Sequence, residues 1–483
     1  MDVKTLFGLT VIPAGIVGGI VMACLSSRIR DLFFLLLVFL SPFIERLDLN
    51  YVSREWYRGT SRGFEVSVLD ILAISILVSS MLFPRRDEVR GFWPASFGLM
   101  LLFFCYAAFN VAISEPRLFG LFELFRMARG FVLVLAVAFY VRTEREVRLF
   151  LGAMVMLIAY EALLSIKQRY LGGVHRVYGT LDESNSLSGF LCMTSPLLVA
   201  GLNSRVPKWV KVLCALAIPL ACVGEILTIS RAGLITIGLV LLGTTLTTIS
   251  LRITPRKVAC AMVIVVGAAG MLAKSWKTLS TRFHESNFKE EYESKKNLGR
   301  GYYLRIAKTI AGERPFGVGL NNWSYWASNK YGPKLGYPFV PYKGTDREPS
   351  DKIPENSNLD EAQAAPAHNL SALTVGELGI PGLALFLLLW LRWFQMGATF
   401  LRRRTASPLR RIPIGIFFGF CGMFLQCLTE WFYRHLPLYY MFHIMLGVLM
   451  SLYWIRRREL RAAAAPAETE PDYLPAPALA TSA

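Results

Sequence analysis

One histidine stands where a polar stretch of the chain runs into an apolar helix. The segment "AAPAHNLSALTVGELGIPGLALF" covers residues 364–386, and His368 lies at its junction, followed directly by Asn369. An imidazole titrates near pH ~6.5 and can serve as a general base. A histidine at a helix start can equally be satisfied by the polar edge of a membrane. The segment alone favours this packing interpretation. Whether His368 can act as a base depends on which groups face it in the folded protein.

Arginines form the second group of candidates. The block "NLGRGYYLRIAKTIAGERPFGVGLNNWSYW", residues 297–326, carries Arg300 and Arg305 ahead of a glycine-containing turn. A guanidinium is a planar fork that can bind two phosphate oxygens at once. The glycines would let backbone amides of the turn approach a ligand closely. Ordinary solvated surface explains the same pattern, and the block by itself favours that explanation.

Three further connections carry basic residues. In "LTISRAGLI", residues 227–235, Arg231 lies between two long apolar runs, where it can snorkel to headgroups or bind a charged lipid group. The stretch "GGVHRVYGTLDESNSLSGFL", residues 172–191, contains His175, Arg176 and Asn185. The stretch "SREWYRGTSRGFE", residues 53–65, contains three arginines, some of which can simply pair with Glu55 and Glu65.

The elements that must position these residues are membrane helices. Of the 483 residues, 54% are hydrophobic and only 18% are charged, whereas soluble domains carry about a quarter charged residues. Apolar runs of nearly membrane-spanning length recur along the chain, and a bilayer core is about 30 Å thick. We predict an all-α polytopic membrane protein with about 12–13 transmembrane helices. The expected spans are 6–24, 29–44, 66–83, 95–113, 118–141, 149–166, 186–203, 210–229, 232–250, 257–273, 370–391, 412–428 and 436–455.

The net charge of +18 reflects membrane topology rather than binding to nucleic acid. The basic residues sit in short loops such as "RTEREVR" and "LRRRTASPLRR", as in cytoplasmic loops of membrane proteins. With these loops inside, the N-terminus lies outside and the C-terminus inside. The connections expected to face outward are 45–65, 167–185, 274–367 and 429–435.

The longest outward connection divides the chain. We expect N-terminal transmembrane helices over 1–273, a partly helical loop subdomain over 274–367, C-terminal transmembrane helices over 368–455 and a disordered cytoplasmic tail over 456–483. The loop is rich in Trp and Tyr and carries charges of both signs, which is untypical of a linker. The eight cysteines all lie in apolar segments, so we expect neither disulfides nor a metal site.

Together, the candidates point to a polyanionic ligand at the outer face. Four outward connections each present arginine there, and the longest adds a histidine and aromatic rings that suit sugar stacking. A lipid pyrophosphate carrying a glycan would satisfy all of these features. A transporter or flippase of such lipids would use the same arginines without needing a base at His368. A non-catalytic scaffold would leave the outward arginines unexplained.

The order and spacing of three motifs add a family resemblance. They are "SRAG" at 230–233, "GR…ERPFGVGLNNW" at 299–323 and "HNLSALTVGELGIPGL" at 368–383. With these motifs, the many spans and the long loop before the histidine, the chain resembles the O-antigen ligase and Wzy-type polymerase superfamily of bacterial membrane glycosyltransferases. The resemblance implies a GT-C-like fold with a long periplasmic loop. It also implies an enzyme of the bacterial inner membrane. No carboxylate cluster or His/Cys set at ligand spacing appears, so we expect arginines rather than a metal to neutralise the phosphates, and no cofactor.

The resemblance further implies an activity at the periplasmic face. A glycan would pass from an undecaprenyl-diphosphate-linked donor to a hydroxyl of a glycan or lipid A–core acceptor. The segment Arg300–Leu304 matches the Arg-x-x-x-Leu element of the ligases, and Arg231 matches their arginine at the membrane edge. The family's histidine motif is matched by His368, Asn369, Gly379 and Gly382. Leu383 stands where ligases usually have Thr, so ligase and polymerase both remain open.

The residues thus receive definite roles. His368 and Arg300 are the predicted catalytic residues, the first as base and the second at the leaving diphosphate. The residues predicted to bind substrate are Arg231, Arg305, Arg176 and Asn369.

Overall fold

The computed structural model describes residues 3–54, 57–84, 92–249, 270, 273, 276, 280–281, 300–337, 339–341, 363–402 and 410–464. Every structural statement below concerns these residues. The predicted span 257–273 lies almost entirely outside them. Most of residues 274–299 and all of residues 342–362 of the long loop also lie outside them.

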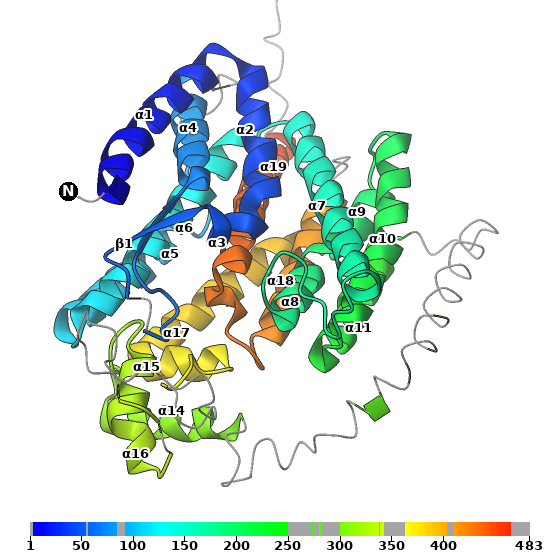
Figure 1. Ribbon diagram of the computed structural model, residues 1–483. Helices are drawn as coiled ribbons and strands as arrows, with labels where there is room; N and C mark the ends of the chain where they lie inside the picture. The colour runs from blue at the N-terminus through cyan, green and yellow to red at the C-terminus, as the bar shows by residue number, and fades with distance from the viewer. Residues whose placement is uncertain are drawn as a thin grey trace, which may run out of the picture.

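The described chain folds into a bundle of apolar helices (Figure 1). Each predicted span other than 257–273 coincides with helical chain, because each is a nearly uninterrupted apolar run. The sheet content is one hairpin, in which β1 (Asp48–Tyr51) pairs antiparallel with β2 (Phe64–Ser67). The principal helices are α1 (Val3–Leu25), α2 (Ser27–Leu40), α4 (Val68–Leu82), α5 (Phe97–Ile113), α6 (Arg117–Tyr140), α7 (Glu144–Tyr170), α10 (Lys208–Thr228), α11 (Arg231–Thr248), α17 (Leu370–Ala398), α18 (Arg411–Gln426) and α19 (Leu436–Ala464).

The chain is an all-α polytopic membrane protein. Six of the described helices are long and apolar enough to cross a bilayer, and four further apolar helices are shorter. Helix α6 has the length but carries Glu123, Arg126 and Arg129 on its buried side. Ionisable groups inside a membrane bundle are costly and often functional, so these three residues need partners within the protein.

Two predicted boundaries differ from the structure. The expected span 186–203 is divided into α8 (Ser184–Thr194) and α9 (Pro196–Asn203). Pro196 stands at the start of the second helix, where its missing N–H costs nothing. Helix α19 continues to Ala464, so residues 456–464 are helical and a disordered tail can begin only after them.

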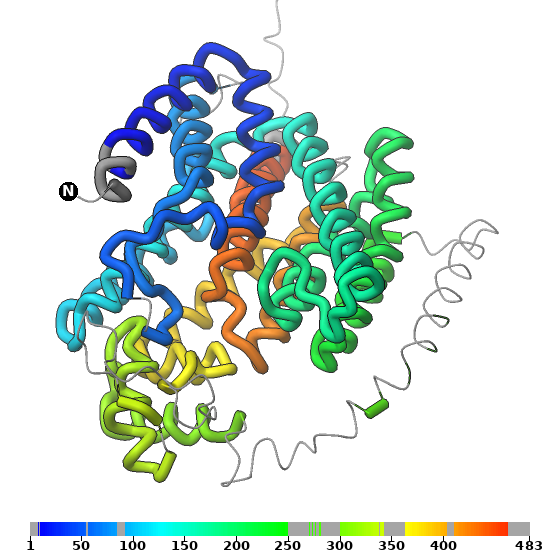
Figure 2. The backbone as a smooth tube through the Cα atoms, in the orientation of Figure 1, coloured from blue at the N-terminus to red at the C-terminus, as the bar shows by residue number. Residues whose placement is uncertain are grey.

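The connections predicted to face outward meet at one end of the bundle. Arg46 pairs with Asp182 at 3.2 Å, which joins the connection 45–65 to 167–185. Arg58 donates to the carbonyl of Gln363 at 2.9 Å, which joins 45–65 to the end of the long loop. The helices of that loop, α14 (Gly301–Glu313), α15 (Trp323–Trp326) and α16 (Gly332–Lys334), lie beside the first half of α17 (Figure 2). These connections, which were predicted to lie on the same side of the membrane, therefore contact one another at one surface of the protein.

Helix α17 is broken at Gly379. This residue has φ +70° and ψ −172°, which separates residues 370–378 from 380–398. A Cβ at Gly379 would lie 2.0 Å from the carbonyl oxygen of Pro315, so only glycine fits. The turn 315–319 fills the break with three backbone hydrogen bonds: Val318 N to Gly376 O at 2.9 Å, Gly319 N to Glu377 O at 2.9 Å and Ile380 N to Pro315 O at 3.0 Å.

This arrangement corrects one expectation. The amides of the glycine turn bind the backbone of α17 rather than a ligand. Gly379 itself serves the break in the backbone of α17. At Gly382 the close neighbour from another helix is Tyr106 of α5, whose Cε1 lies 2.9 Å from the point where a Cβ would stand.

The outer loop has a hydrophobic cluster of its own. It contains Tyr302 and Tyr303 of α14, Trp323 and Tyr331 of the following segment, and the first turns of α17 through Leu373. The cluster packs the loop directly onto the helix that follows His368. The loop and the histidine are therefore positioned by the same contacts.

Candidate active site

A buried carboxylate, Glu430, joins the predicted catalytic residues. His368 Nδ1 lies 2.5 Å from Glu430 Oε2, and Arg300 Nη2 lies 2.9 Å from Glu430 Oε1. The amide of Asn185 donates to the same Oε1 at 3.0 Å. The side chain of Glu430 is 6% exposed, whereas those of His368 and Arg300 are 33% and 27% exposed. The carboxylate is thus covered, whereas His368 and Arg300 reach the surface.

The contact with Glu430 determines which nitrogen of His368 carries the proton. A carboxylate oxygen accepts hydrogen bonds, so Nδ1–H donates to Glu430, and in the neutral imidazole the lone pair is then on Nε2. A partly exposed histidine with its lone pair on Nε2 can accept a proton from a substrate. Orientation of a catalytic imidazole by a buried carboxylate is a recurring arrangement in enzymes.

Local structure places His368 just before α17. Asn369 caps this helix, because its side chain accepts from the backbone N–H of Ala372 at 2.8 Å. Its amide also donates to the carbonyl of Leu428 at 2.7 Å, and Leu370 N donates to Cys427 O at 3.0 Å. These bonds hold the start of α17 against the segment that carries Glu430. The helix-start role considered for His368 therefore belongs to Asn369.

Arg176 contacts Asn185, which belongs to the cluster of side chains around Glu430 (His368, Arg300 and Asn185). Its Nη2 donates to Asn185 Oδ1 at 2.8 Å, and its Nε donates to the carbonyl of Thr228 at 3.2 Å. Thr228 is the last residue of α10, and Arg231 begins α11 after only two intervening residues. Arg176 therefore links the Glu430 cluster to the turn that presents Arg231.

The turn before Arg231 is strained. Ile229 has φ +56° and ψ +34° and is buried. A β-branched residue in this left-handed region is an outlier that the surrounding structure must enforce. The next residue, Ser230, caps α11 by accepting from Gly233 N. The short connection expected around Arg231 is present.

Arg305 occupies a different position from Arg300. Its Nε donates to the hydroxyl of Tyr337 at 2.6 Å, within the outer loop. Arg300 lies immediately before α14, whereas Arg305 lies on its second turn, so the two guanidinium groups point to different neighbours. The ring of Tyr303, between them in sequence, lies with its centroid 5.3 Å from that of His368. Burial raises the pKa of Tyr303 to about 12, so its hydroxyl stays protonated.

A second ionic network lies deeper in the protein and was not predicted. Arg434 forms ion pairs with Glu377 of α17 and, at 3.9 Å, with Glu123 of α6. Arg126 pairs with Glu123 and donates to the carbonyl of Arg434 at 2.7 Å. Arg434 belongs to an outward connection, yet its charge is neutralised by buried carboxylates. Arg434 therefore stabilises the fold and is not one of the outward arginines that could bind a polyanionic ligand.

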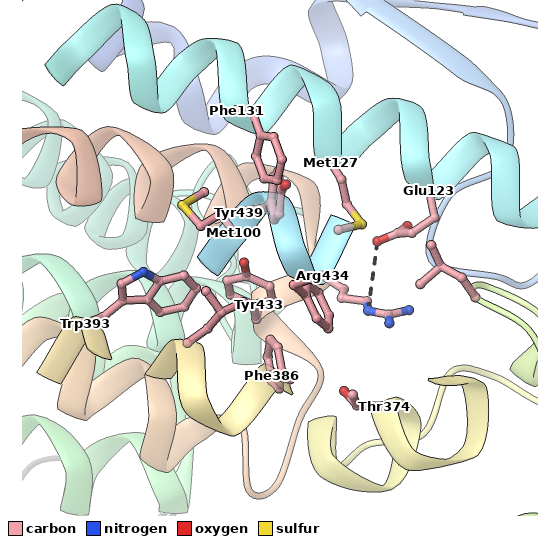
Figure 3. Close-up of a pocket in the computed structure, with 13 residues that line it drawn as sticks. Met100, Glu123, Met127, Phe131, Thr374, Phe386, Trp393, Tyr433, Arg434 and Tyr439 are labelled. Atoms are coloured by element: carbon pink, nitrogen blue, oxygen red, sulfur yellow. Dashed lines mark ion pairs between the residues drawn. The ribbon is translucent and has the colours of Figure 1, made fainter. Parts of the chain in front are cut away.

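A cavity adjoins this network (Figure 3). Its walls come from α5, α6, α17 and the segment around Tyr433, and are mostly aromatic rings and methionines. Arg434 and Glu123 form its charged part, and Thr374 lies on the first half of α17. Thr374 follows His368 by six residues, so the first half of α17 runs from the site to the wall of the cavity.

The stretch 53–65 has a structural role that the sequence did not indicate. The side-chain oxygen of Asn321, in "GLNNW", accepts from the backbone N–H of Thr60 at 2.8 Å, and its amide donates to Ser61 O at 2.8 Å. The hydroxyl of Tyr57 donates to the carbonyl of Asn321. Glu65 pairs with Arg129 of α6 at 3.7 Å. This stretch anchors the turn that fills the break in α17.

Sequence reasoning missed Glu430, the residue that joins the site. Its signal was weak, namely one acid in the short outward connection 429–435 between two apolar spans. In the part of the chain that the structure describes, no group of three or more His, Cys, Asp or Glu side chains is arranged to hold a metal ion.

Comparison with known proteins agrees with the motifs. Residues 212–387, just over a third of the chain, match the family model described as O-antigen ligase. No curated protein matches the chain. The matched segment contains Arg231, Arg300 and His368, whereas Glu430 lies beyond it and Arg176 before it. Residues 212–387 of this polytopic membrane protein are therefore similar to the O-antigen ligase family.

Proposed function

We propose that the protein transfers a glycan from an undecaprenyl-diphosphate-linked donor to an acceptor hydroxyl, with His368 as the general base. The observation that supports this most strongly is the hydrogen bond from His368 Nδ1 to buried Glu430, beside Arg300. A transporter of the same lipid would need the arginine but not an oriented imidazole. The acceptor is a glycan or a lipid A–core, which corresponds to polymerase or ligase activity.

In the proposed step, the acceptor oxygen attacks the anomeric carbon of the donor sugar. The bond between that carbon and the diphosphate oxygen breaks, and the bonding electrons leave with undecaprenyl diphosphate. The acceptor proton passes to His368 Nε2. Such base catalysis typically contributes about 10²–10⁴-fold to a rate. Glu430 stabilises the imidazolium that forms, because its carboxylate lies against Nδ1.

Arg300 is the proposed partner of the donor diphosphate. In the structure its guanidinium pairs with Glu430 and remains 27% exposed. A diphosphate is a second anion for this group, and positive charge placed in advance at a developing anion is often the largest catalytic contribution. As Arg300 turns toward the phosphates, Asn185 would keep Glu430 in place for His368, because it donates to the same carboxylate oxygen.

The remaining predicted residues have graded roles in this proposal. Arg231 reaches the donor from the capped start of α11. Arg176 acts through Asn185 and Thr228, which makes it a positioning residue. Asn369 holds the start of α17. Arg305, bonded to Tyr337, contacts the more distant sugars of the glycan rather than the diphosphate.

We further propose that this end of the bundle faces the periplasm from the bacterial inner membrane. The basic loops at the other end support this orientation through the positive-inside rule. A cysteine replacing Lys334, whose side chain is 53% exposed, should react with an impermeant maleimide in intact spheroplasts. A cysteine replacing Lys208, at the start of α10 at the opposite end, should react only after the membrane is opened. The reverse pattern would contradict the orientation.

The decisive experiment is a transfer assay with purified protein, a lipid-linked donor and an added acceptor. The wild type should release undecaprenyl diphosphate only as glycan appears on the acceptor. His368→Ala should lose transfer while still binding the donor, since Arg300 remains. Movement of intact donor between leaflets without release of undecaprenyl diphosphate would indicate a transporter instead.

A further inference from the structure

At the end of the bundle opposite His368, arginines gather where three helices end or begin. Arg402 follows the end of α17, Arg410 and Arg411 precede and begin α18, and Arg456 lies on the last turns of α19. The charges of Arg410 and Arg402 act on Arg456, and those of Arg410 and Arg205 act on Arg411. Glu459 also acts on Arg456, but more weakly than either arginine. This arginine cluster carries excess positive charge.

Arg456 differs from an ordinary arginine of a cytoplasmic loop. It is only 7% exposed, and its Nε and Nη1 have no hydrogen-bond partner in the described part of the chain. The guanidinium carbon lies 4.9 Å from the centre of the Phe400 ring. Contact with an aromatic face partly offsets the desolvation of a cation, but buried donors without acceptors remain costly. A solvated positive-inside residue would not be enclosed in this way.

The surroundings indicate what could satisfy these donors. The nearest charges are mainly further arginines, so the missing acceptor is an anion. In the second half of α17, the exposed side chains Leu387, Leu388 and Leu391 form an apolar strip that suits contact with lipid chains. Basic pockets between transmembrane helices on the cytoplasmic side are typical sites for anionic lipid headgroups.

We infer that the arginine cluster around Arg456 binds the phosphate headgroup of an anionic phospholipid from the cytoplasmic leaflet. The headgroup oxygens would accept from Nε and Nη1 of Arg456 and lie near Arg410 and Arg411, while an acyl chain follows the leucine strip of α17. Such a lipid would join the ends of α17, α18 and α19. These are the helices that carry His368 at their other ends or flank Glu430.

The inference can be tested without measuring transfer. Full-length protein in detergent or in phosphatidylcholine nanodiscs would be titrated with cardiolipin or phosphatidylglycerol while thermal unfolding is recorded. Anionic lipid should raise the Tm, and phosphatidylcholine or inorganic phosphate at equal concentration should not. Arg456→Leu should lose most of this rise. Without anionic lipid, the Tm of Arg456→Leu should equal or exceed that of the wild type, because an unpaired buried cation has been removed.

Arg461→Leu is the matched control, since Arg461 lies on the same helix but is exposed. It should retain the full lipid response. An equal response in Arg456→Leu and wild type would overturn the inference, and stabilisation by inorganic phosphate alone would show a general anion site instead of a lipid site. Glu468, Glu470 and Asp472 follow α19 in the sequence. A lipid response that appears only after these three acids are changed to Gln, Gln and Asn would identify the chain's own carboxylates as the occupant.

Arg456→Lys provides a check that the protein still folds with a charge at this position. It keeps a cation but loses the fork, so it should show a reduced lipid response with a normal Tm in detergent alone. The glycosyl transfer proposed at His368 is not needed for any of these readouts. A failure here would therefore leave the proposed function unaffected, and the reverse also holds.

Discussion

His368 and Glu430 are 62 residues apart in the chain, yet Nδ1 of the first lies 2.5 Å from Oε2 of the second. The contact crosses from the start of α17 to the connection after α18. Glu430 also accepts from Arg300 and Asn185. One buried carboxylate therefore orients the proposed base and neutralises the proposed phosphate-binding arginine.

The first prediction concerns this carboxylate. Glu430→Gln should lower kcat by about 10²–10⁴-fold, because the amide no longer stabilises the imidazolium and can hold the wrong tautomer. The KM for the donor should stay the same or fall, because Arg300 loses a competing anion. Steady-state kinetics at matched expression measure both quantities. Glu313→Gln, at an exposed acid paired with Lys330 and Lys334, should behave as wild type; a rise in KM with unchanged kcat at Glu430 would refute the role.

A second prediction separates charge from geometry at Arg300. Lys keeps the positive charge but offers a point donor in place of the planar fork. Bonds to charged groups are worth about 1.5–3 kcal/mol, so Arg300→Lys should slow transfer by roughly ten- to a hundredfold. Arg305→Lys should be tolerated better, since Arg305 bonds Tyr337 within the loop. Transfer rates of the two variants at equal protein level decide the matter, and a larger loss at Arg305 would assign the diphosphate to the other arginine.

A third prediction tests the break in α17. Gly379→Ala should destabilise the protein by about 1–3 kcal/mol from its left-handed conformation alone. The new Cβ would also collide with the carbonyl of Pro315 and displace the turn 315–319. Gly312→Ala is the control, because a Cβ there meets open space on α14 and should add about 0.5–1 kcal/mol of helix stability. Thermal unfolding in detergent compares them, and equal Tm values would mean that the break is not required.

A fourth prediction concerns pH and the acids around Arg129. Asp48, Asp70 and Glu65 lie 3.2, 2.8 and 3.7 Å from its guanidinium. Burial raises the pKa of Asp48 from 3.8 to about 7; Arg129 opposes this rise, while the other two carboxylates add to it. The folded protein therefore holds a proton on Asp48 that the unfolded chain releases at lower pH. Between these two pKa values, stability must fall as the pH rises.

Asp48→Asn removes this titration and keeps an oxygen that accepts from Arg129. The Tm of the wild type should fall as the pH rises from about 5 to about 8, and the Tm of the variant should fall clearly less. At pH 8 the variant should be the more stable of the two. Parallel Tm curves for the two proteins would show that Asp48 does not titrate in this range.

Much of the architecture could be read from the sequence, because apolar length decides membrane helices locally. The described helices coincide with the expected spans, and the outward connections predicted from the basic loops do meet at one end of the bundle. The positions at which helices are interrupted were harder to predict from the sequence. The division between α8 and α9 at Pro196 has a local signal, whereas the break at Gly379 depends on the turn at Pro315 entering from a distant segment.

For the site, the sequence alone supplied the residues whose chemistry is intrinsic: an imidazole, and arginines whose charge does not depend on surroundings. It could not supply Glu430, because a carboxylate becomes an orienting group only when a distant histidine and arginine lie against it. It likewise could not separate Arg300, which reaches Glu430, from Arg434, which is neutralised by buried acids. The charge of an arginine follows from its residue type. Which carboxylate it pairs with depends on how the helices pack, so only the tertiary structure decides which arginines can still bind a ligand.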